Sequence, residues 1–287
     1  MLPNSSNISL IECPRDAMQG WEEYIPIDIK AAYLNALLKV GFDVLDFGSF
    51  VSEKAIPQLR DTKEVLEKLD MSSTKTKLLA IIANVRGAKE AVGFEQISYL
   101  GFPFSISEEF QKRNTNSTIA ESLQRVEEIQ ALCIANKKEL LIYISMGFGN
   151  PYNEKWNADS VIHWVNRLSN LGIKTISIAD TIGVSNPENI SHLFLNLIPS
   201  FSNIDFGVHL HSNPSSWHEK VEAAAKSGCK RFDSAFKGIG GCPMADDHLV
   251  GNLATENLVN YFGGPDSLGL NQDYYFKSAE MANEIFQ

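Results

Sequence analysis

Polar residues that could bind one divalent cation occur in three widely separated parts of the chain. Asp16 follows the first apolar run, His209 and His211 close a late one, and Asn252 follows a glycine-rich stretch. A carboxylate, two imidazoles and an amide, without a thiolate, suit an octahedral Mg²⁺ or Mn²⁺ site, and Zn²⁺ is also compatible with them. Because these residues are almost the whole chain apart, the fold must bring them together.

The two histidines are separated by a single residue in a strand-like run. Residues two apart in an extended segment project from the same face, so both imidazoles could bind the same ion. A hydrogen-bonded histidine pair is the alternative. Because Asp16 and Asn252 supply further ligands, we favour the metal site.

Two further side chains could take part in making or breaking bonds. The guanidinium of Arg15, next to Asp16, could stabilise an oxyanion or an enolate, and a structural ion pair is the alternative. Cys242 follows the glycine-rich residues 238–241, whose backbone freedom suits a loop that closes over a site. A phosphate-binding turn in which the cysteine is incidental is the alternative for this loop.

Apolar, β-branched runs alternate with amphipathic segments along the whole chain. Asn186 is a candidate N-cap, and Gly41, Gly172 and Gly228 stand where helices are expected to end. The pattern predicts strands near 8–13, 43–48, 77–83, 96–103, 139–146, 174–180, 203–211 and 231–236. It predicts helices near 27–40, 58–70, 86–93, 118–136, 157–171, 187–198, 214–228 and 254–263.

Eight strand–helix units with short connections imply parallel strands joined by right-handed crossovers. In a chain of 287 residues this favours an α/β protein that is a single closed (β/α)₈ barrel, a TIM barrel, over residues 1–287. A doubly wound open sheet is the alternative, but the Gly-x-Gly-x-x-Gly turn of a dinucleotide fold is missing. The candidate residues all fall at carboxyl ends of strands, as do Asp46 and Asp180, which could serve the chemistry or tie loops together.

Composition narrows the classes of function. A formal net charge of −10 disfavours binding to nucleic acid or to an anionic membrane, although a small anionic ligand remains compatible with it. Neither a membrane-spanning apolar run nor a signal-peptide pattern is present, so we expect a cytoplasmic protein. The cysteines form no Cys-x-x-Cys pair, and we expect Cys13, Cys133 and Cys229 to be small core residues.

Several short segments match the signatures of one enzyme family. They are Pro14-Arg15-Asp16 with Gln19, Ser49-Phe50-Val51-Ser52 with Lys54 and Pro57-Gln58, Asp180-Thr181-Ile182-Gly183-Val184, Gly240-Gly241-Cys242-Pro243, and Gly251-Asn252-Leu253-Ala254-Thr255-Glu256. Through them nearly the whole chain resembles 3-hydroxy-3-methylglutaryl-CoA lyases, which belong to a superfamily of metal-dependent lyase and synthase barrels. The last two segments are the most specific, because the related synthases lack this cysteine loop.

The resemblance implies a retro-Claisen cleavage of the C2–C3 bond of an acyl-CoA substrate, which gives acetoacetate and the enolate of acetyl-CoA. The implied metal ligands are Asp16, His209, His211 and Asn252. Arg15 would stabilise the enolate, Cys242 would protonate its carbon or relay a proton, and we also expect Asp46 to take part in catalysis. A homodimer is a further implication.

The substrate-binding residues that we expect are Arg15, Gln19, Asn84, Asp180 and Thr181. Lys54, Asn84 and Arg86 could hold the CoA moiety from beyond the second and third strands, and solvated side chains are the alternative for them.

The chain departs from the family pattern at several positions. Asp46 stands where the family commonly has glutamate, Ser212-Asn213 follow the histidines in place of Asp-Thr, Ala17 replaces a glycine, and Asn150 replaces a cysteine. A lyase for a related 3-hydroxyacyl-CoA is therefore one alternative. A synthase that condenses acetyl-CoA with a 2-oxo acid and a non-catalytic metal- or acyl-CoA-binding protein are the others.

Overall fold

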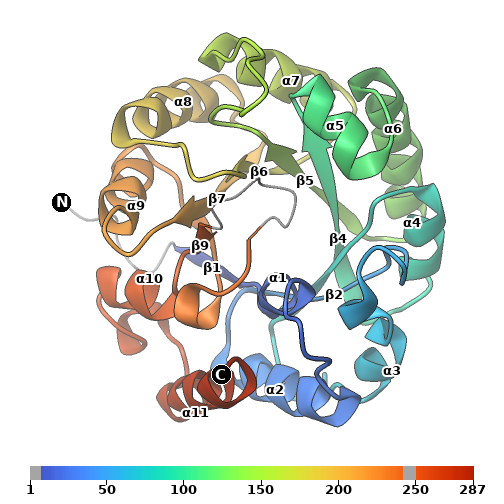
Figure 1. Cartoon of the computed structure of the whole chain (residues 1–287), viewed down its shortest axis with the longest axis vertical. Coiled ribbons are helices and arrows are strands. Elements are labelled where there is room, and N and C mark those ends of the chain that lie inside the picture. Colours follow the sequence, from blue (N-terminus) through green and yellow to red (C-terminus); the bar gives the residue numbers. More distant parts are fainter. Residues whose placement is uncertain (1–7, 242–249) are drawn as a thin grey trace.

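Eight parallel strands close into a barrel surrounded by helices (Figure 1). The computed structural model describes residues 8–241 and 250–287. β1 pairs with both β2 and β8, and β6 pairs with β7, so the sheet has no open edge between these strands. The predicted TIM barrel is confirmed. The strands are β1 (Ser9–Glu12), β2 (Val44–Ser49), β3 (Lys77–Ile81), β4 (Ile97–Ser105), β5 (Glu139–Ser145), β6 (Thr175–Asp180), β7 (Asp205–Ser212) and β8 (Arg231–Ser234).

The eight helices expected from the sequence pattern all occur. They are α2 (Ile27–Val40), α3 (Thr62–Glu67), α4 (Val85–Ala91), α6 (Ile119–Ala135), α7 (Ala158–Asn170), α8 (Pro187–Ser200), α9 (Trp217–Lys226) and α10 (Thr255–Tyr261). α3 is shorter than the predicted 58–70, because Pro57–Leu59 form a separate 3₁₀ turn, η2. The structure adds elements that were not predicted: α1 (Pro14–Gln19), α5 (Glu108–Thr115), α11 (Gln272–Ile285) and a short strand, β9 (Gly251–Asn252).

Local chemistry explains where the helices begin and end. α6 begins with a capping box, in which the Thr118 side chain accepts from the amide of Glu121 and the Glu121 carboxylate accepts from the amide of Thr118. Asn186 caps α8 as expected. Gly41 ends α2 with a φ of 91°, a left-handed conformation that a side chain would strain.

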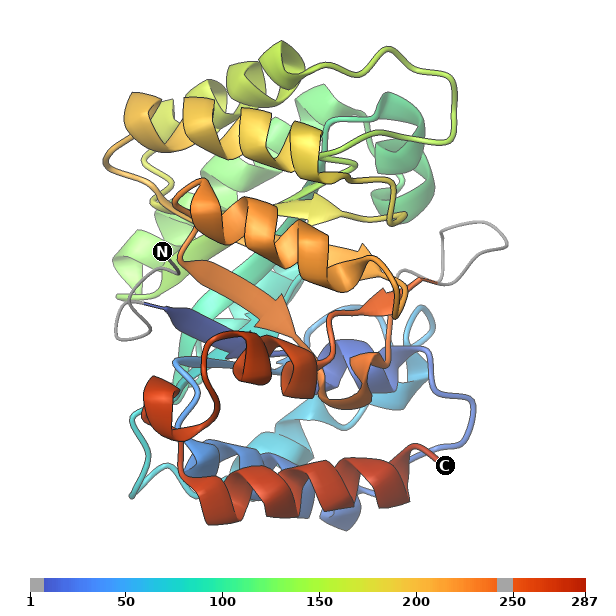
Figure 2. The same ribbon diagram turned by 90° about the vertical axis from the view of Figure 1, so that its left-hand side faces the viewer.

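Two apolar layers hold these elements together. One fills the space between the strands and the helices, and a smaller cluster fills the barrel itself with residues such as Ile11, Cys13, Leu79 and Leu141. The strand arrows in Figure 2 point to the end of the barrel that carries α1 and β9, where the active site of such a barrel lies. No helix among the described residues is long and apolar enough to cross a membrane.

Glu12 joins β1 to the connection between β8 and α10. Its side chain is fully buried and accepts hydrogen bonds from the amide of Phe236, at 3.0 Å, and from the hydroxyl of Thr255, at 2.5 Å. Burial raises the pKa of Glu12 from 4.5 to about 8, because these hydrogen bonds only partly offset the loss of solvation. The folded protein therefore holds a proton on Glu12 at neutral pH.

We expect the Glu12→Gln variant to gain stability relative to the unmodified protein as the pH rises from 5 to 8. Over this range the unfolded chain has already lost most of the Glu12 proton, whereas the folded protein keeps it up to about pH 8, so folding becomes less favourable with rising pH. Glutamine is neutral throughout, so the difference at pH 8 should reach a few kcal/mol. Urea unfolding of both proteins at the two pH values measures it. Glu280→Gln, at an exposed glutamate, is the control. The prediction would be contradicted if the free energy of unfolding depended on pH in the same way for Glu12→Gln and the unmodified protein.

Candidate active site at the carboxyl end of the barrel

The imidazoles of His209 and His211 face each other on β7, with their Nε2 atoms 3.2 Å apart. Nδ1 of His209 lies 3.1 Å from a carboxylate oxygen of Asp233, and Nδ1 of His211 lies 3.0 Å from the carbonyl oxygen of Thr181. Because both partners are acceptors, each Nδ1 is assigned the proton and each Nε2 is left with a lone pair. Two facing lone pairs repel unless a proton or a metal cation stands between them.

The ionisation of the histidines follows their surroundings. Burial and the neighbouring His209 lower the pKa of His211, which favours its neutral, metal-binding form. Burial also acts to lower the pKa of His209, but the hydrogen bond and charge of Asp233 outweigh it and raise the pKa. Asp233 thus fixes both the tautomer and the charge preference of His209.

Asp16 completes a group of three ligand atoms with the two histidines, all within 4.8 Å of one another. Burial alone would raise the pKa of Asp16, but the charge of Arg15 and the two imidazoles outweigh it and lower the pKa from 3.8 to about 2. The carboxylate is therefore ionised at neutral pH. An anionic oxygen beside two imidazole lone pairs fits a divalent cation.

Asn252 reaches this group because β9 pairs antiparallel with β7, which sets Asn252 opposite His211. The Asn252 amide donates to the Asp16 carboxylate at 2.7 Å and to the carbonyl of Ile239 at 2.8 Å. To bind a cation through its oxygen, the amide would turn about its last side-chain bond. All four ligands expected from the sequence thus lie together at one end of the barrel.

Gly240 makes room for this contact. A Cβ at Gly240 would lie 2.5 Å from the Asn252 amide nitrogen and 2.8 Å from the carbonyl oxygen of Asp16, and its φ of 102° also disfavours a side chain. Cys242, the expected proton donor, lies outside the described residues, as does His248.

Arg15 is held in place by two carboxylates. Its Nη2 lies 2.6 Å from Asp46 and its Nε 3.0 Å from the same group, while Nη1 donates to Asp16 at 2.9 Å and to Gln19 at 2.8 Å. Arg15 and Asp16 lie on α1 and not, as expected, at the end of β1. Burial raises the pKa of Asp46 from 3.8 to about 6, and the charge of Arg15 opposes this only in part. Arg15 borders the cavity described next, whereas Asp46 is fully buried beneath it.

A cavity of about 420 Å³ opens above these groups. Its lining combines charged and polar side chains with apolar ones, which suits a substrate with a polar reacting end. The polar lining residues include Arg15, Asp16, Gln19, Arg113, Thr181, His209 and His211. The apolar ones include Val51, Ile56, Ile81 and Phe110.

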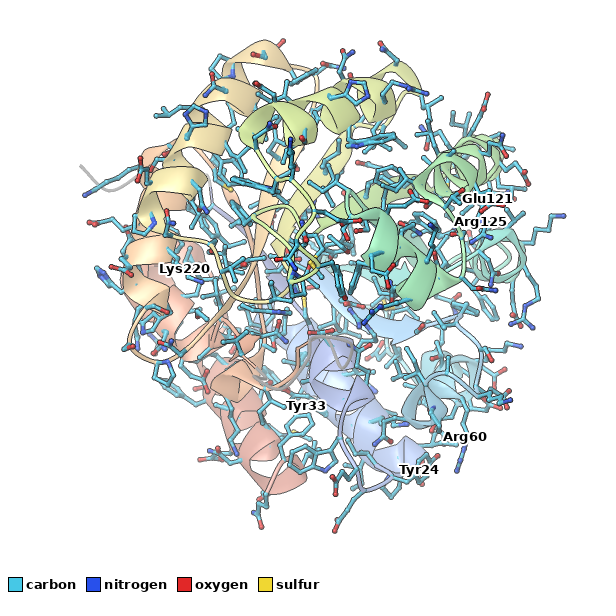
Figure 3. The ribbon with its side chains drawn as sticks, turned by 45° about the horizontal axis from the view of Figure 1, so that its top comes forward. Tyr24, Tyr33, Arg60, Glu121, Arg125 and Lys220 are labelled. Atoms are coloured by element: carbon cyan, nitrogen blue, oxygen red, sulfur yellow. The ribbon has the colours of Figure 1, made fainter. Side chains whose placement is uncertain are left out.

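Two of the expected substrate-binding residues have local structural partners. Asp180 accepts hydrogen bonds from Ser185 and pairs at 2.9 Å with the buried Lys220. Lys220 lies on α9 and is labelled in Figure 3. Asn84 caps α4 by accepting from the amide of Gly87 at 2.9 Å. Roles in substrate binding for Asp180 and Asn84 stay predictions, whereas Gln19 and Thr181 do border the cavity.

Two positioning groups, Asp233 and the carbonyl of Thr181, were not predicted from the sequence. A carboxylate in the strand predicted for 231–236 was an available signal for the first. The backbone carbonyl left no signal, because its role depends on how β6 and β7 pair.

Comparison with known proteins agrees with this geometry. Residues 8–265 match the model of the HMGL-like family. The cytoplasmic 3-hydroxy-3-methylglutaryl-CoA lyase of Homo sapiens is 31% identical over 264 residues, which cover 90% of this chain and 68% of the human protein. The mitochondrial hydroxymethylglutaryl-CoA lyase of Bos taurus is 32% identical over 253 residues, which cover 88% of this chain and 76% of the bovine protein.

Solved structures of HMG-CoA lyases are also similar to this chain. An HMG-CoA lyase of Acinetobacter baumannii, in complex with coenzyme A and 3-methylmalate, superposes with a TM-score of 0.88 at 30% identity and covers 99% of this chain and 93% of that one. The hydroxymethylglutaryl-CoA lyase of Pseudomonas aeruginosa gives a TM-score of 0.90 at 25% identity, with 99% and 94% covered. The barrel, the shared sequence and the match over most of its length show that this chain belongs to the HMGL-like family.

Proposed function

We propose that the chain is a divalent-metal-dependent carbon–carbon lyase that cleaves 3-hydroxy-3-methylglutaryl-CoA to acetyl-CoA and acetoacetate. The convergence of Asp16, His209 and His211 beside Arg15 in the lining of one cavity carries this proposal. Asn252, the fourth expected ligand, contacts Asp16 directly. Relatives named as lyases for this substrate support the choice of substrate. Mg²⁺ or Mn²⁺ is the proposed cation, because the set mixes oxygen and imidazole ligands, and Zn²⁺ is the second candidate.

A divalent cation bound there would acidify the C3 hydroxyl of the substrate and fix its orientation. A base would take up the hydroxyl proton, C3 would become the ketone carbon of acetoacetate, and the electron pair of the broken C2–C3 bond would pass to the thioester enolate. Arg15 has five N–H groups, of which Nε and one on Nη2 serve Asp46 and the two on Nη1 serve Asp16 and Gln19. Within the described part of the chain, one N–H on Nη2 therefore remains to donate to the enolate oxygen.

Asp46 would act through Arg15. Its two oxygens fix the guanidinium plane, and its full burial keeps it from the substrate. We therefore propose a positioning role for Asp46, while proton delivery to the enolate carbon is assigned to Cys242.

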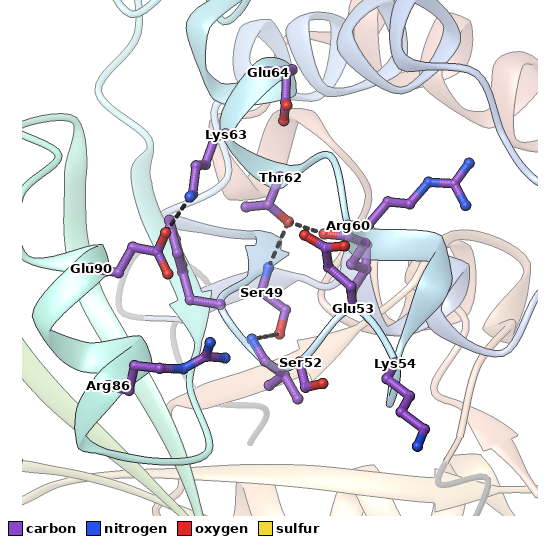
Figure 4. A pocket seen from close by; sticks show the side chains of 13 residues that line it. Ser49, Ser52, Glu53, Lys54, Arg60, Thr62, Lys63, Glu64, Arg86 and Glu90 are labelled. Carbon is purple, nitrogen blue, oxygen red and sulfur yellow. Dashed lines mark hydrogen bonds and ion pairs between the residues drawn. The ribbon is translucent and has the colours of Figure 1, made fainter.

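We also propose that the CoA phosphates lie in a second cavity, of about 520 Å³, which is lined by residues such as Lys54 and Arg86 (Figure 4). Val51 borders both cavities, so the pantetheine arm could pass over it. Among the cations that line this cavity, Lys63 pairs with Glu90 and Arg60 lies over the ring of Tyr24. Lys54 and Arg86 form no ion pair with any described residue, which leaves them available to phosphate.

The Arg86→Ala variant should raise the KM of the CoA thioester about tenfold, because a charge-assisted contact to phosphate is lost. The KM of the corresponding pantetheine thioester, which lacks the nucleotide, should stay unchanged. Steady-state kinetics with both thioesters measure this, and Lys63→Ala is the matched control. Equal KM increases for both thioesters would contradict the phosphate subsite.

The proposed activity is tested by preparing metal-free protein with a chelator and measuring release of acetyl-CoA from 3-hydroxy-3-methylglutaryl-CoA. We expect no turnover without metal and full recovery with Mg²⁺ or Mn²⁺. A folded, metal-loaded sample without turnover would contradict this substrate. Related 3-hydroxyacyl-CoA thioesters would then be tested, since Asp46 and Ser212 depart from the family pattern. Release of CoA from acetyl-CoA and 2-oxo acids would instead favour a synthase.

A cytoplasmic location and a homodimeric assembly are further proposals. The human relative is described as cytoplasmic, although several relatives are mitochondrial. Cell fractionation and light scattering check the location and the assembly.

A further inference from the structure

Cys13, His209 and Asp233 bring a second set of ligand atoms together inside the barrel. A thiol sulfur, an imidazole nitrogen and a carboxylate oxygen lie within 4.8 Å of one another, and Cys13 and Asp233 are almost fully buried. His209 belongs to both sets, because its Nε2 faces His211 and its Nδ1 faces Asp233. Two candidate cation sites thus share one imidazole.

The second set has bonding capacity that the described residues do not use. Oδ1 of Asp233 is buried and accepts no hydrogen bond within the described part of the chain. Among residues 8–241 and 250–287, the Cys13 thiol makes only a long hydrogen bond, 3.7 Å, to the carbonyl of Ile11. A buried carboxylate oxygen without a partner is costly, so a bound ion or an ordered water is needed to satisfy it.

We propose that Cys13, His209 and Asp233 form a site for a thiophilic divalent cation such as Zn²⁺ or Cd²⁺. Sulfur, nitrogen and a single oxygen suit Zn²⁺, whereas Mg²⁺ prefers oxygen ligands. Binding would release the thiol proton to solvent and transfer the Nδ1 proton of His209 to its Nε2. The thiolate and the Asp233 carboxylate then neutralise the two charges of the cation, which makes its burial tolerable.

Occupation of this site would disable the neighbouring one. Once Nε2 of His209 carries a proton, it has no lone pair for a cation shared with His211 and Asp16. Thiophilic cations would therefore inhibit the enzyme through Cys13. This consequence rests on the proposed function, but the binding itself does not.

Binding is tested by titrating Cd²⁺ into protein that holds excess Mg²⁺ and following the ultraviolet charge-transfer absorption of the cadmium–thiolate bond. The Cys242→Ser background removes the thiol outside the described residues. We expect one equivalent to bind with this absorption, and we expect Cys13→Ser to abolish it. Cys229→Ser, at a buried thiol elsewhere, should keep it. No absorption, or absorption that persists in Cys13→Ser, would overturn the proposal.

If Cys13→Ser does not fold, X-ray absorption is measured on Cys242→Ser protein that holds excess Mg²⁺ and one equivalent of zinc. A sulfur neighbour at about 2.3 Å is expected, and a shell of only nitrogen and oxygen near 2.0 Å would overturn the site and leave water as the partner of Asp233.

Turnover tests the coupling between the two sites. Zinc added to the Mg²⁺-loaded protein should reduce turnover about tenfold or more, and Cys13→Ser should lose less than about twofold relative to its own zinc-free rate. Equal inhibition of both proteins would overturn the coupling. Absence of turnover from every sample would instead contradict the proposed function, and the cadmium absorption would still decide the site.

Discussion

The Arg15→Met variant is expected to lower kcat by about 10²–10³-fold while divalent cations still bind. Methionine removes the one N–H that can donate to the developing enolate oxygen, and loss of one such donor costs about this much in other acyl-transfer sites. Arg15 is not itself a metal ligand, so Mn²⁺ should still bind Asp16 and the histidines. Acetyl-CoA release measures kcat, and calorimetry with Mn²⁺ measures binding.

Arg15→Lys should not restore the rate, because an ammonium group cannot bridge Asp46 and Asp16 in the same fixed plane. Arg167→Met, at an exposed arginine of α7, is the matched control and should leave kcat unchanged. A kcat of Arg15→Met within about threefold of the unmodified protein would remove Arg15 from the chemistry.

The His211→Ala variant should weaken Mn²⁺ binding at least about 100-fold. Loss of a group that only orients a ligand already lowers metal affinity by up to about 100-fold, and loss of the ligand itself should lower it at least as much. Turnover should fall in parallel at low metal concentration. It should recover in part when Mn²⁺ is raised, since Asp16, His209 and Asn252 remain. Calorimetry and the metal dependence of acetyl-CoA release measure the two effects.

His192→Ala, at an exposed histidine of α8, is the control for His211→Ala and should bind Mn²⁺ normally. Unchanged Mn²⁺ affinity in His211→Ala would contradict the metal site. The imidazole pair on β7 would then be the hydrogen-bonded pair weighed as the alternative.

The barrel was predictable because each of its eight repeats carries an apolar strand and an amphipathic helix. The helices on the outside keep one buried face, as α6 does with Val126 and Ile129, so their period shows in the sequence. Of the four missed elements, α11 does keep a buried face, with Tyr275, Ser278 and Ala282, and the other three lack such a pattern. α1 has only six residues, α5 is mostly polar, and β9 has only two residues. Such elements form because of tertiary contacts, and periodicity cannot detect them.

The candidate site was predictable in its residue types but not in its supporting contacts. The spacing of His209 and His211, together with the family resemblance, predicted the four ligands, and membership of the family is confirmed. The role of Asp233 depends on the register between β7 and β8, which no local pattern specifies. The individual roles of the site residues stay predictions until the variants are measured.

The antiparallel pairing of Asn252 with His211 limits how the connection from Asn252 to α10 can vary in length. Adjacent residues of a strand project to opposite faces, so sliding the partner of β7 by one position would turn the Asn252 amide away from Asp16. It would also bring Gly251 or Leu253, neither of which has a polar side chain, opposite His211. A single inserted residue just after Asn252 should therefore be more damaging than many substitutions there, although the barrel strands themselves would be untouched.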